Sequence, residues 1–420
     1  MTLNRLVDAR SSLPLFVLGI FAAYAVIPRL VFNLGLPDDY FVDLSNLALL
    51  SCVAMCLGYS LPLFDSRFRA GAGRIKINAK RFHFLVWAAF LLFMAFTFLT
   101  ADHIPIWSAI RGASVAELDA QRGAFLKGRT GLEAILPYLS TLFVSALLPY
   151  SLVSLFFRRS KFRYLALLIF LGFSVSFLVK SLFLNIAFPL FYFMTRLRKV
   201  TITKSVLLIG LSFAVLYVVS KLALANALSA ETPVHGIDVA DFFKARYQAA
   251  GLGEFLVWRA IAVPVFTAAD TLRVFAEQLG SDQLFGATSS FICAIFGFDR
   301  VPLEKMVYAH EFGWNELANA NAVFITDAFA NLGWTGVVLF SMFVGQSLRW
   351  FRKSSDVAFQ ALWMNYCFGL YGGSLIGILL SNGYLLMFGI ALFVKLDDKP
   401  YRRAAVRRAN LPAAKAASPA

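Results

Sequence analysis

Long apolar runs separated by short basic segments dominate the pattern of hydrophobic and polar positions along this chain. A membrane-spanning helix needs about 20 mostly apolar residues, and shorter runs can cross where the bilayer thins around them. Ten runs fit: Leu13–Ile27, Leu44–Leu63, Phe84–Leu99, Ala134–Phe156, Tyr164–Val179, Ser181–Phe193, Val206–Leu224, Thr335–Leu348, Val357–Leu380 and Gly383–Val394. The pattern predicts an all-α polytopic membrane protein with ten to twelve transmembrane helices.

The composition supports this fold class. Hydrophobic residues make up 59% of the 420 residues, and charged residues make up only 15%. A soluble domain has roughly 45–50% apolar and about 25% charged residues, so this chain cannot cover itself with polar surface. Residues 1–400 are predicted to form a single membrane domain. Residues 401–420, rich in Ala, Arg and Pro, are predicted to form a disordered basic cytoplasmic tail.

Charged residues are distributed unevenly between the two sides of the predicted bundle. With the N-terminus inside, 26 of the 39 Lys and Arg residues and 5 of the 24 acidic residues fall on the inner side. The other 13 basic and 19 acidic residues fall outside, so the inside carries +21 and the outside −6. Because cytoplasmic loops are enriched in Lys and Arg, this distribution predicts that both termini are cytoplasmic.

Two long segments fall outside in this topology, at about residues 101–133 and 225–333. The second is too apolar for a separate soluble domain. It contains a predicted helix at Glu254–Gln278 and a short apolar run at Phe285–Phe298, which we expect to lie on the outer leaflet or to re-enter the membrane. The inner loops are short and contain no GxxxxGK[ST] or GxGxxG pattern. A functional site is therefore expected at the outer face.

Basic residues in apolar surroundings are the first candidates for chemistry. Arg259 interrupts the apolar stretch 255–266, and Lys180 lies in a tight outer turn between two short runs. A basic residue at membrane depth is costly unless it is paired or lines a polar cavity, and Arg binds phosphate through two parallel hydrogen bonds. We predict that a lipid pyrophosphate binds at Arg259, Lys180, Arg122 and Arg273. For cations near the interface, snorkelling to the headgroups is the alternative interpretation.

Candidates for acid–base chemistry lie in the late outer segment. His310 and Glu311 are adjacent, and a neutral imidazole or a carboxylate with a tuned pKa can deprotonate a sugar hydroxyl. The alternative is a solvated surface loop. The pair Asp38 and Asp39, just outside the first run, is a weaker candidate for the base, because a solvated acidic loop explains it better.

Amide and carboxylate side chains follow at spacings that suit sugar binding. If the segment is helical, Asn319, Asp327 and Asn331 share a face within about 120°. Such groups suit sugar hydroxyls, or they cap the helix and bond to neighbouring helices. No HExxH, CxxC or GxSxG pattern appears and the four His residues are scattered, so no metal ion and no other cofactor is expected.

The stretch Asn319–Gly336 resembles the late outer-loop-to-helix motif of bacterial O-antigen and oligosaccharide repeat-unit polymerases, the Wzy-like proteins. Members often show Asn-Thr/Ala-Asn, then Asp-Ala-Tyr/Phe-Ala-Asn, then Gly-x-x-Gly entering a helix. Here the three parts are Asn319-Ala320-Asn321, Asp327-Ala328-Phe329-Ala330-Asn331 and Gly333-Trp334-Thr335-Gly336. Arg259 before Pro264 is also similar to an Arg in the family's late loop. Lys180-Ser181 departs from the family's usual Ser-Arg.

The resemblance implies a polymerase of the bacterial inner membrane whose active face is periplasmic. Such an enzyme moves a growing glycan from polyprenyl pyrophosphate to the terminal sugar of another lipid-linked repeat unit. A chain-length regulator and a flippase of the same pathway are its expected partners. We expect His310, Glu311 and Asp327 to be catalytic, and Asn319, Asn321 and Asn331 to bind sugar.

Three other functions remain open at this point. An O-antigen ligase would use the same donor with a different acceptor. A lipid-sugar glycosyltransferase that moves a monosaccharide would use Asp38 or Asp39 as its base. A transporter or flippase of lipid-linked sugars should carry polar groups deep in several spans, whereas most charges here lie at span ends.

Overall fold

The computed structural model describes residues 8–70, 75–113, 115–126, 129, 131–176, 180–196, 239–245, 247–249, 251–314, 318–320 and 323–397. The predicted run Val206–Leu224, the candidate Asn321 and the tail 401–420 lie outside these residues. So does the turn that precedes Lys180.

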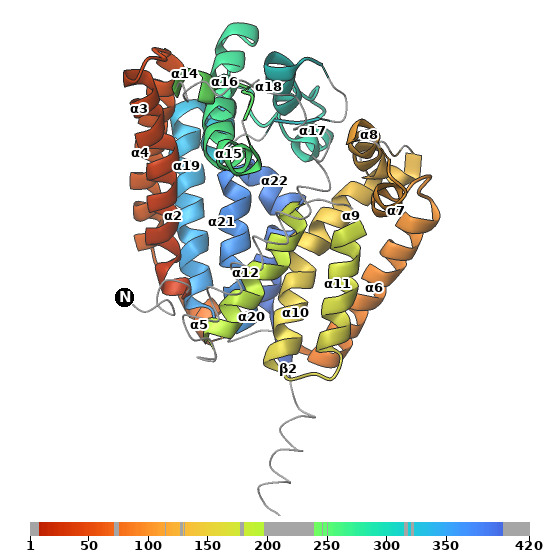
Figure 1. The fold of residues 1–420 in the computed structure, drawn as a ribbon. Helices are drawn as coiled ribbons and strands as arrows, with labels where there is room; N and C mark the ends of the chain where they lie inside the picture. The colour runs from red at the N-terminus through yellow and green to blue at the C-terminus, as the bar shows by residue number, and fades with distance from the viewer. Residues whose placement is uncertain are drawn as a thin grey trace, which may run out of the picture.

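Helices make up most of the described chain, and two short strands complete it (Figure 1). The first half contains η1 (Ala9–Ser11), α2 (Ser12–Ile20), η2 (Phe21–Val26), α3 (Ile27–Asn33), α4 (Asp39–Ser60), α5 (Asp65–Ala70), β1 (Ile75–Asn78), α6 (Ala79–Leu99), α7 (Pro105–Ile110), α8 (Val115–Leu126), η3 (Gly131–Ile135), α9 (Leu136–Leu142), η4 (Phe143–Leu147), α10 (Leu148–Phe157), α11 (Arg163–Ser176) and α12 (Lys180–Arg196). The second half contains α14 (Val239–Phe242), α15 (Leu252–Val257), η5 (Trp258–Ala262), α16 (Val263–Gln278), α17 (Ser290–Phe296), α18 (Leu303–Phe312), α19 (Phe324–Lys353), α20 (Val357–Ala361), α21 (Trp363–Tyr371), α22 (Leu375–Leu380), α23 (Tyr384–Phe393) and β2 (Val394–Asp397).

Six continuous helical stretches among the described residues are long and apolar enough to cross a bilayer. They are Ala9–Asn33, Asp39–Ser60, Ala79–Leu99, Glu133–Phe157, Gly253–Gln278 and Phe324–Lys353. Shorter apolar helices lie at Arg163–Ser176 and Tyr384–Phe393. The predicted class, a helical membrane protein, is therefore confirmed. The predicted helix Glu254–Gln278 is also present, and its length and apolar composition would allow it to span the bilayer.

The predicted continuous run at 357–380 is instead broken into α20, α21 and α22. Gly372 and Gly373 separate α21 from α22, because glycine is costly inside a helix. Ser374 then caps α22 by accepting a hydrogen bond at Oγ from the Gly377 N–H, at 3.1 Å.

Three of the long helices contain a π-helical turn that ends two residues before a proline. The turns are η2, η4 and η5, and the prolines are Pro28, Pro149 and Pro264. Because proline has no N–H and its ring clashes with the carbonyl of the preceding turn, a straight α-helix would break there. The wider π turn lets each helix continue through its proline.

Helices α4 and α19 are in backbone contact near the C-terminal end of α4. A β-carbon on Gly58 would lie 2.0 Å from the carbonyl oxygen of Met342, and one on Gly345 would lie 2.0 Å from that of Met55. Small residues allow this approach, as is common between membrane helices. This close approach holds α4 against α19.

The two ends of the bundle differ in character (Figure 1). Helices α7, α8 and α14 to α18 gather at the end that we name the loop end, whereas α5, β2 and α20 mark the opposite, basic end. Strands β1 and β2 pair in parallel at the basic end. There Arg349 donates two hydrogen bonds to Asp65, at 2.9 and 2.7 Å, which lowers the pKa of this carboxyl. Described parts of both long segments that were predicted outside thus lie at the same end.

Candidate functional site

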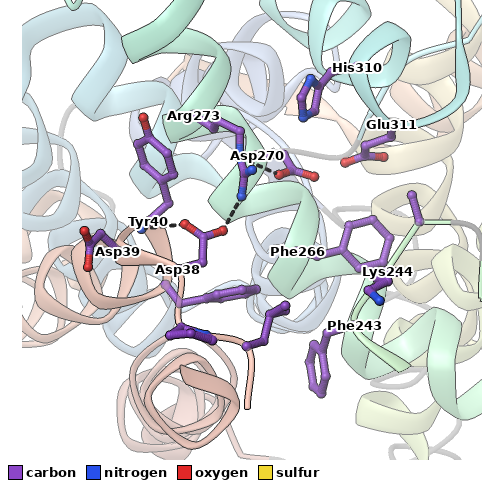
Figure 2. Close-up of a pocket in the computed structure, with 14 residues that line it drawn as sticks. Asp38, Asp39, Tyr40, Phe243, Lys244, Phe266, Asp270, Arg273, His310 and Glu311 are labelled. Atoms are coloured by element: carbon purple, nitrogen blue, oxygen red, sulfur yellow. Dashed lines mark hydrogen bonds and ion pairs between the residues drawn. The ribbon is translucent and has the colours of Figure 1, made fainter. Parts of the chain in front are cut away.

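A cavity of about 830 Å³ opens at the loop end, where α4, α16 and α18 meet (Figure 2). Its lining comes from segments that are far apart in the sequence: Leu36, Pro37, Asp38, Asp39, Tyr40, Phe41, Phe243, Lys244, Ala245, Phe266, Asp270, Arg273, His310 and Glu311. The fold therefore brings together three groups that were predicted separately. These groups are the early acidic pair, one of the four predicted cations and the adjacent His and Glu.

The first wall of the cavity is the N-terminal turn of α4. Asp38 is the N-cap of this helix, because its extended backbone lets Oδ1 accept a hydrogen bond from the Tyr40 N–H at 3.1 Å. Its other carboxylate oxygen, Oδ2, accepts from Arg273. Asp39, in the first turn, is exposed. The Pro-Asp-Asp sequence thus ends the preceding loop and places both Asp residues in the lining, where Asp38 points toward Arg273 and Asp39 points away from it (Figure 2).

The second wall is α16, on which Asp270 and Arg273 lie one turn apart. Arg273 Nε lies 3.3 Å from Asp270 Oδ1, and a terminal nitrogen of the same guanidinium pairs with Asp38. The guanidinium also lies 5.3 Å from the centre of the Tyr40 ring. Figure 2 shows Arg273 between the two carboxylates. Arg273, predicted to bind pyrophosphate, is therefore already engaged by two anionic groups.

The third wall is α18, which ends at Phe312 because Gly313 adopts a positive φ of 92°. His310 is exposed, whereas only 7% of Glu311 is exposed. Glu311 Oε1 has no hydrogen-bond partner in the described chain. Burial, and then the nearby charge of Asp270, raise the pKa of Glu311 to about 8, while Thr267 and Arg259 act in the opposite direction.

Arg259 lies outside the lining but close enough to interact electrostatically with Glu311. It belongs to η5, the π turn that precedes Pro264. A π turn changes the direction of the side chains that precede it relative to those that follow. Asp270 and Arg273, which follow this turn, line the cavity, whereas Arg259, within it, does not.

Asp327 and Asn331, predicted to act in catalysis and sugar binding, lie outside the cavity and are buried. Asp327 Oδ1 accepts from the Thr288 hydroxyl at 3.0 Å and from Asn331 Nδ2 at 3.2 Å. Asn331 Oδ1 accepts from the Gly286 N–H at 2.8 Å. These bonds fasten the segment after α16 to the kink in α19, where Gly333 has a positive φ of 60°. These hydrogen bonds fit the structural interpretation, whereas Asp327 Oδ2 is buried and has no hydrogen-bond partner among the described residues, so the roles of both side chains stay predictions.

Three other predicted residues do not line the cavity: Asn319, Arg122 and Lys180. Asn319 is exposed in the segment before α19. Arg122, on α8, is half-buried, and burial lowers the pKa of its guanidinium. Lys180 begins α12. The pyrophosphate role of Lys180 and Arg122 and the sugar role of Asn319 stay predictions.

Several lining residues were missed by sequence reasoning. Asp270 was not among the predicted site residues, and Lys244, Phe243 and Phe266 have no recognisable signal in the sequence. Their common feature, a place in one cavity, depends on how α14, α16 and α18 pack. In the part of the chain that the structure describes, no group of three His, Cys, Asp or Glu side chains is arranged to hold a metal ion.

Comparison with protein-family models, with characterised proteins and with solved structures gives no match for this chain. The functional inference therefore depends on the cavity itself. The cavity contains the buried carboxyl group of Glu311, one of whose oxygens has no hydrogen-bond partner among the described residues, and the adjacent exposed imidazole of His310. Its lining is rich in carboxyl groups.

Proposed function

We propose that this protein is a membrane glycosyltransferase that polymerises lipid-linked oligosaccharide repeat units at the outer face of a bacterial inner membrane. The observation that carries the proposal is Glu311, a buried carboxyl group that lines the cavity and has one oxygen without a hydrogen-bond partner among the described residues. A general base needs a free oxygen to receive the proton and a pKa near the working pH. With a pKa of about 8, Glu311 meets both requirements.

In this reaction the cavity holds the terminal sugar of the acceptor repeat unit. The acceptor hydroxyl oxygen bonds to the anomeric carbon of the donor glycan while the bond from that carbon to the pyrophosphate oxygen breaks. Glu311 takes the hydroxyl proton, and the pyrophosphate leaves with the bonding electrons. His310 is exposed beside Glu311 and interacts electrostatically with Asp270, so it is suited to pass the proton to solvent.

Arg259 is the best-supported cation for the donor pyrophosphate. Arg273 is paired with Asp38 and Asp270, so binding an anion there would mean giving up two carboxylate contacts. Arg259, by contrast, lies near Glu311 without lining the cavity. Arg can stabilise the charge that develops on a leaving pyrophosphate. The donor would then approach Glu311 from the side of Arg259 and the acceptor from the cavity.

Deletion of the gene in its host tests the proposal, with the surface polysaccharide analysed on a gel. A polymerase predicts loss of long chains while single repeats stay attached. Loss of every repeat, with lipid-linked polymer accumulating, would instead indicate a ligase. Normal long chains would refute both functions. A chain-length regulator and a flippase of the same pathway are the proposed partners of the polymerase.

A second candidate is a monosaccharide-transferring lipid-sugar glycosyltransferase with Asp39 as its base. The observation in its favour is that Asp39 is exposed and lines the same cavity as Glu311. The two variants Asp39→Asn and Glu311→Gln separate the candidates, because each function predicts that a different one abolishes transfer.

A further inference from the structure

Carboxyl groups outnumber cationic side chains in the lining of the cavity. Four lining residues have carboxyl groups, namely Asp38, Asp39, Asp270 and Glu311, and only Lys244 and Arg273 are cationic. Both cations are already paired. Lys244 Nζ lies 2.7 Å from Asp241, and Arg273 is held by Asp38 and Asp270. An anionic group that enters the cavity would therefore meet carboxylates and no cation that lacks a partner.

The same lining suits a ligand rich in hydrogen-bond donors. Glu311 Oε1 is buried and has no partner in the described chain, so a donor from the ligand would satisfy it. Asp39 adds an exposed acceptor on the opposite wall. Phe243 and Phe266 supply apolar surface at the side (Figure 2). Binding sites of this kind combine apolar walls with a few polar groups that fix the orientation of the ligand.

We propose that the cavity is the acceptor subsite and selects a terminal sugar that is neutral or carries an amino group, excluding uronic and other acidic sugars. This inference rests on the proposed glycosyltransferase function and names the class of acceptor. A carboxylate on the sugar would enter a lining that contains Asp39 and Asp270, and like charges brought together at a binding site weaken binding. An ammonium group would gain from the same charges.

The test measures binding without turnover. The full-length protein is purified in detergent, and saturation-transfer NMR titrations give dissociation constants for the methyl glycosides of glucosamine, glucose and glucuronic acid. We expect glucosamine to bind at least as tightly as glucose, and glucuronic acid to bind at least about tenfold more weakly than glucose. Raising the salt concentration should bring the dissociation constants of the glucosamine and glucuronic acid glycosides closer together, because screening weakens charge interactions.

Asp39→Asn identifies the charge responsible. This side chain is exposed and is not the N-cap of α4, so its replacement leaves the Asp38 contacts in place. In this variant, the dissociation constant for glucuronic acid divided by that for glucosamine should be severalfold smaller than in the wild type. Asp299→Asn, which removes an exposed carboxylate outside the cavity, is the matched control and should leave the ratio unchanged.

Equal binding of glucuronic acid and glucose would overturn the proposed selectivity. So would an unchanged ratio in Asp39→Asn, or the absence of binding by all three glycosides. Failure of the glycosyltransferase function would look different. In that case the neutral and amino glycosides bind selectively, but the purified protein transfers no glycan.

Discussion

Replacing Glu311 with Gln should change how the stability of the protein depends on pH. The replacement keeps the size and shape of the side chain but removes a carboxyl group that is 7% exposed. The rise of its pKa from 4.5 to about 8 corresponds to roughly 5 kcal/mol between the protonated and ionised forms in the folded protein. Because the pKa is raised on folding, the stabilising contribution of the protonated form is complete below pH 4.5 and is lost as the pH rises through 8.

The size of the effect follows from these two values. Between pH 5 and pH 8 the wild-type protein should lose roughly 3–4 kcal/mol of unfolding free energy through this one group. Glu311→Gln has no charge to bury and should not show this loss. Near pH 5 the variant and the wild type should have similar stability, since the wild-type side chain is then protonated. At pH 8 and above the variant should be the more stable protein.

Thermal unfolding in detergent, followed by tryptophan fluorescence from pH 5 to pH 9, measures the difference. Asp299→Asn is the control, because it removes an exposed carboxylate outside the cavity. It should leave the wild-type pH dependence in place. If the unfolding temperatures of the wild type and of Glu311→Gln fall by the same amount between pH 5 and pH 8, then Glu311 is not held protonated by its surroundings, and the reasoning is refuted.

Three further predictions concern the donor site, the packing and the topology. Arg259→Gln should abolish chain extension at normal protein levels, and Arg259→Lys should restore it only in part because the forked geometry is lost; normal extension by the Gln variant would remove Arg259 from the donor site. Gly345→Val should lower the free energy of unfolding by about 1–3 kcal/mol because the new side chain would clash with the α4 backbone, whereas the control Gly389→Ala, which enters open space, should not. Equal unfolding temperatures for Gly345→Val and the wild type would contradict the close contact between α4 and α19. In a Cys-free background, a membrane-impermeant maleimide should label Ser281→Cys but not Ser160→Cys in intact spheroplasts, and the reverse pattern would place the cavity on the cytoplasmic side.

The sequence predicted the helical membrane class because long apolar runs are visible without knowledge of tertiary contacts. It also predicted the helix at 254–278, which the structure gives as Gly253–Gln278. The two consecutive glycines Gly372 and Gly373 indicate a helix break between α21 and α22. The sequence analysis did not predict this break, because apolar residues on both sides make the run look continuous. The π turns were not predictable, because proline signals a disturbance of the helix without saying how the chain absorbs it.

The candidate site was predicted only in pieces. His310 and Glu311 were chosen for their chemistry, but their proximity to Asp38 depends on contacts between segments more than 270 residues apart. Asp327 and Asn331 illustrate the opposite case, since their spacing suits sugar binding and loop attachment equally well. The residue to which both side chains hydrogen-bond, Thr288, lies about forty residues away in the sequence. Sequence spacing alone contains no information about that pairing.

Polymerisation by the purified protein tests the central claim most directly. Wild type and Glu311→Gln are supplied with lipid-linked repeat units, and the rate of chain growth is compared at pH 8, where the variant is expected to be at least as stable as the wild type. Loss of a general base predicts a rate lower by roughly 10²–10⁴-fold, with substrate binding little changed. Chain growth by Glu311→Gln at the wild-type rate would contradict the account, because the cavity would then lack the base on which the proposed reaction depends.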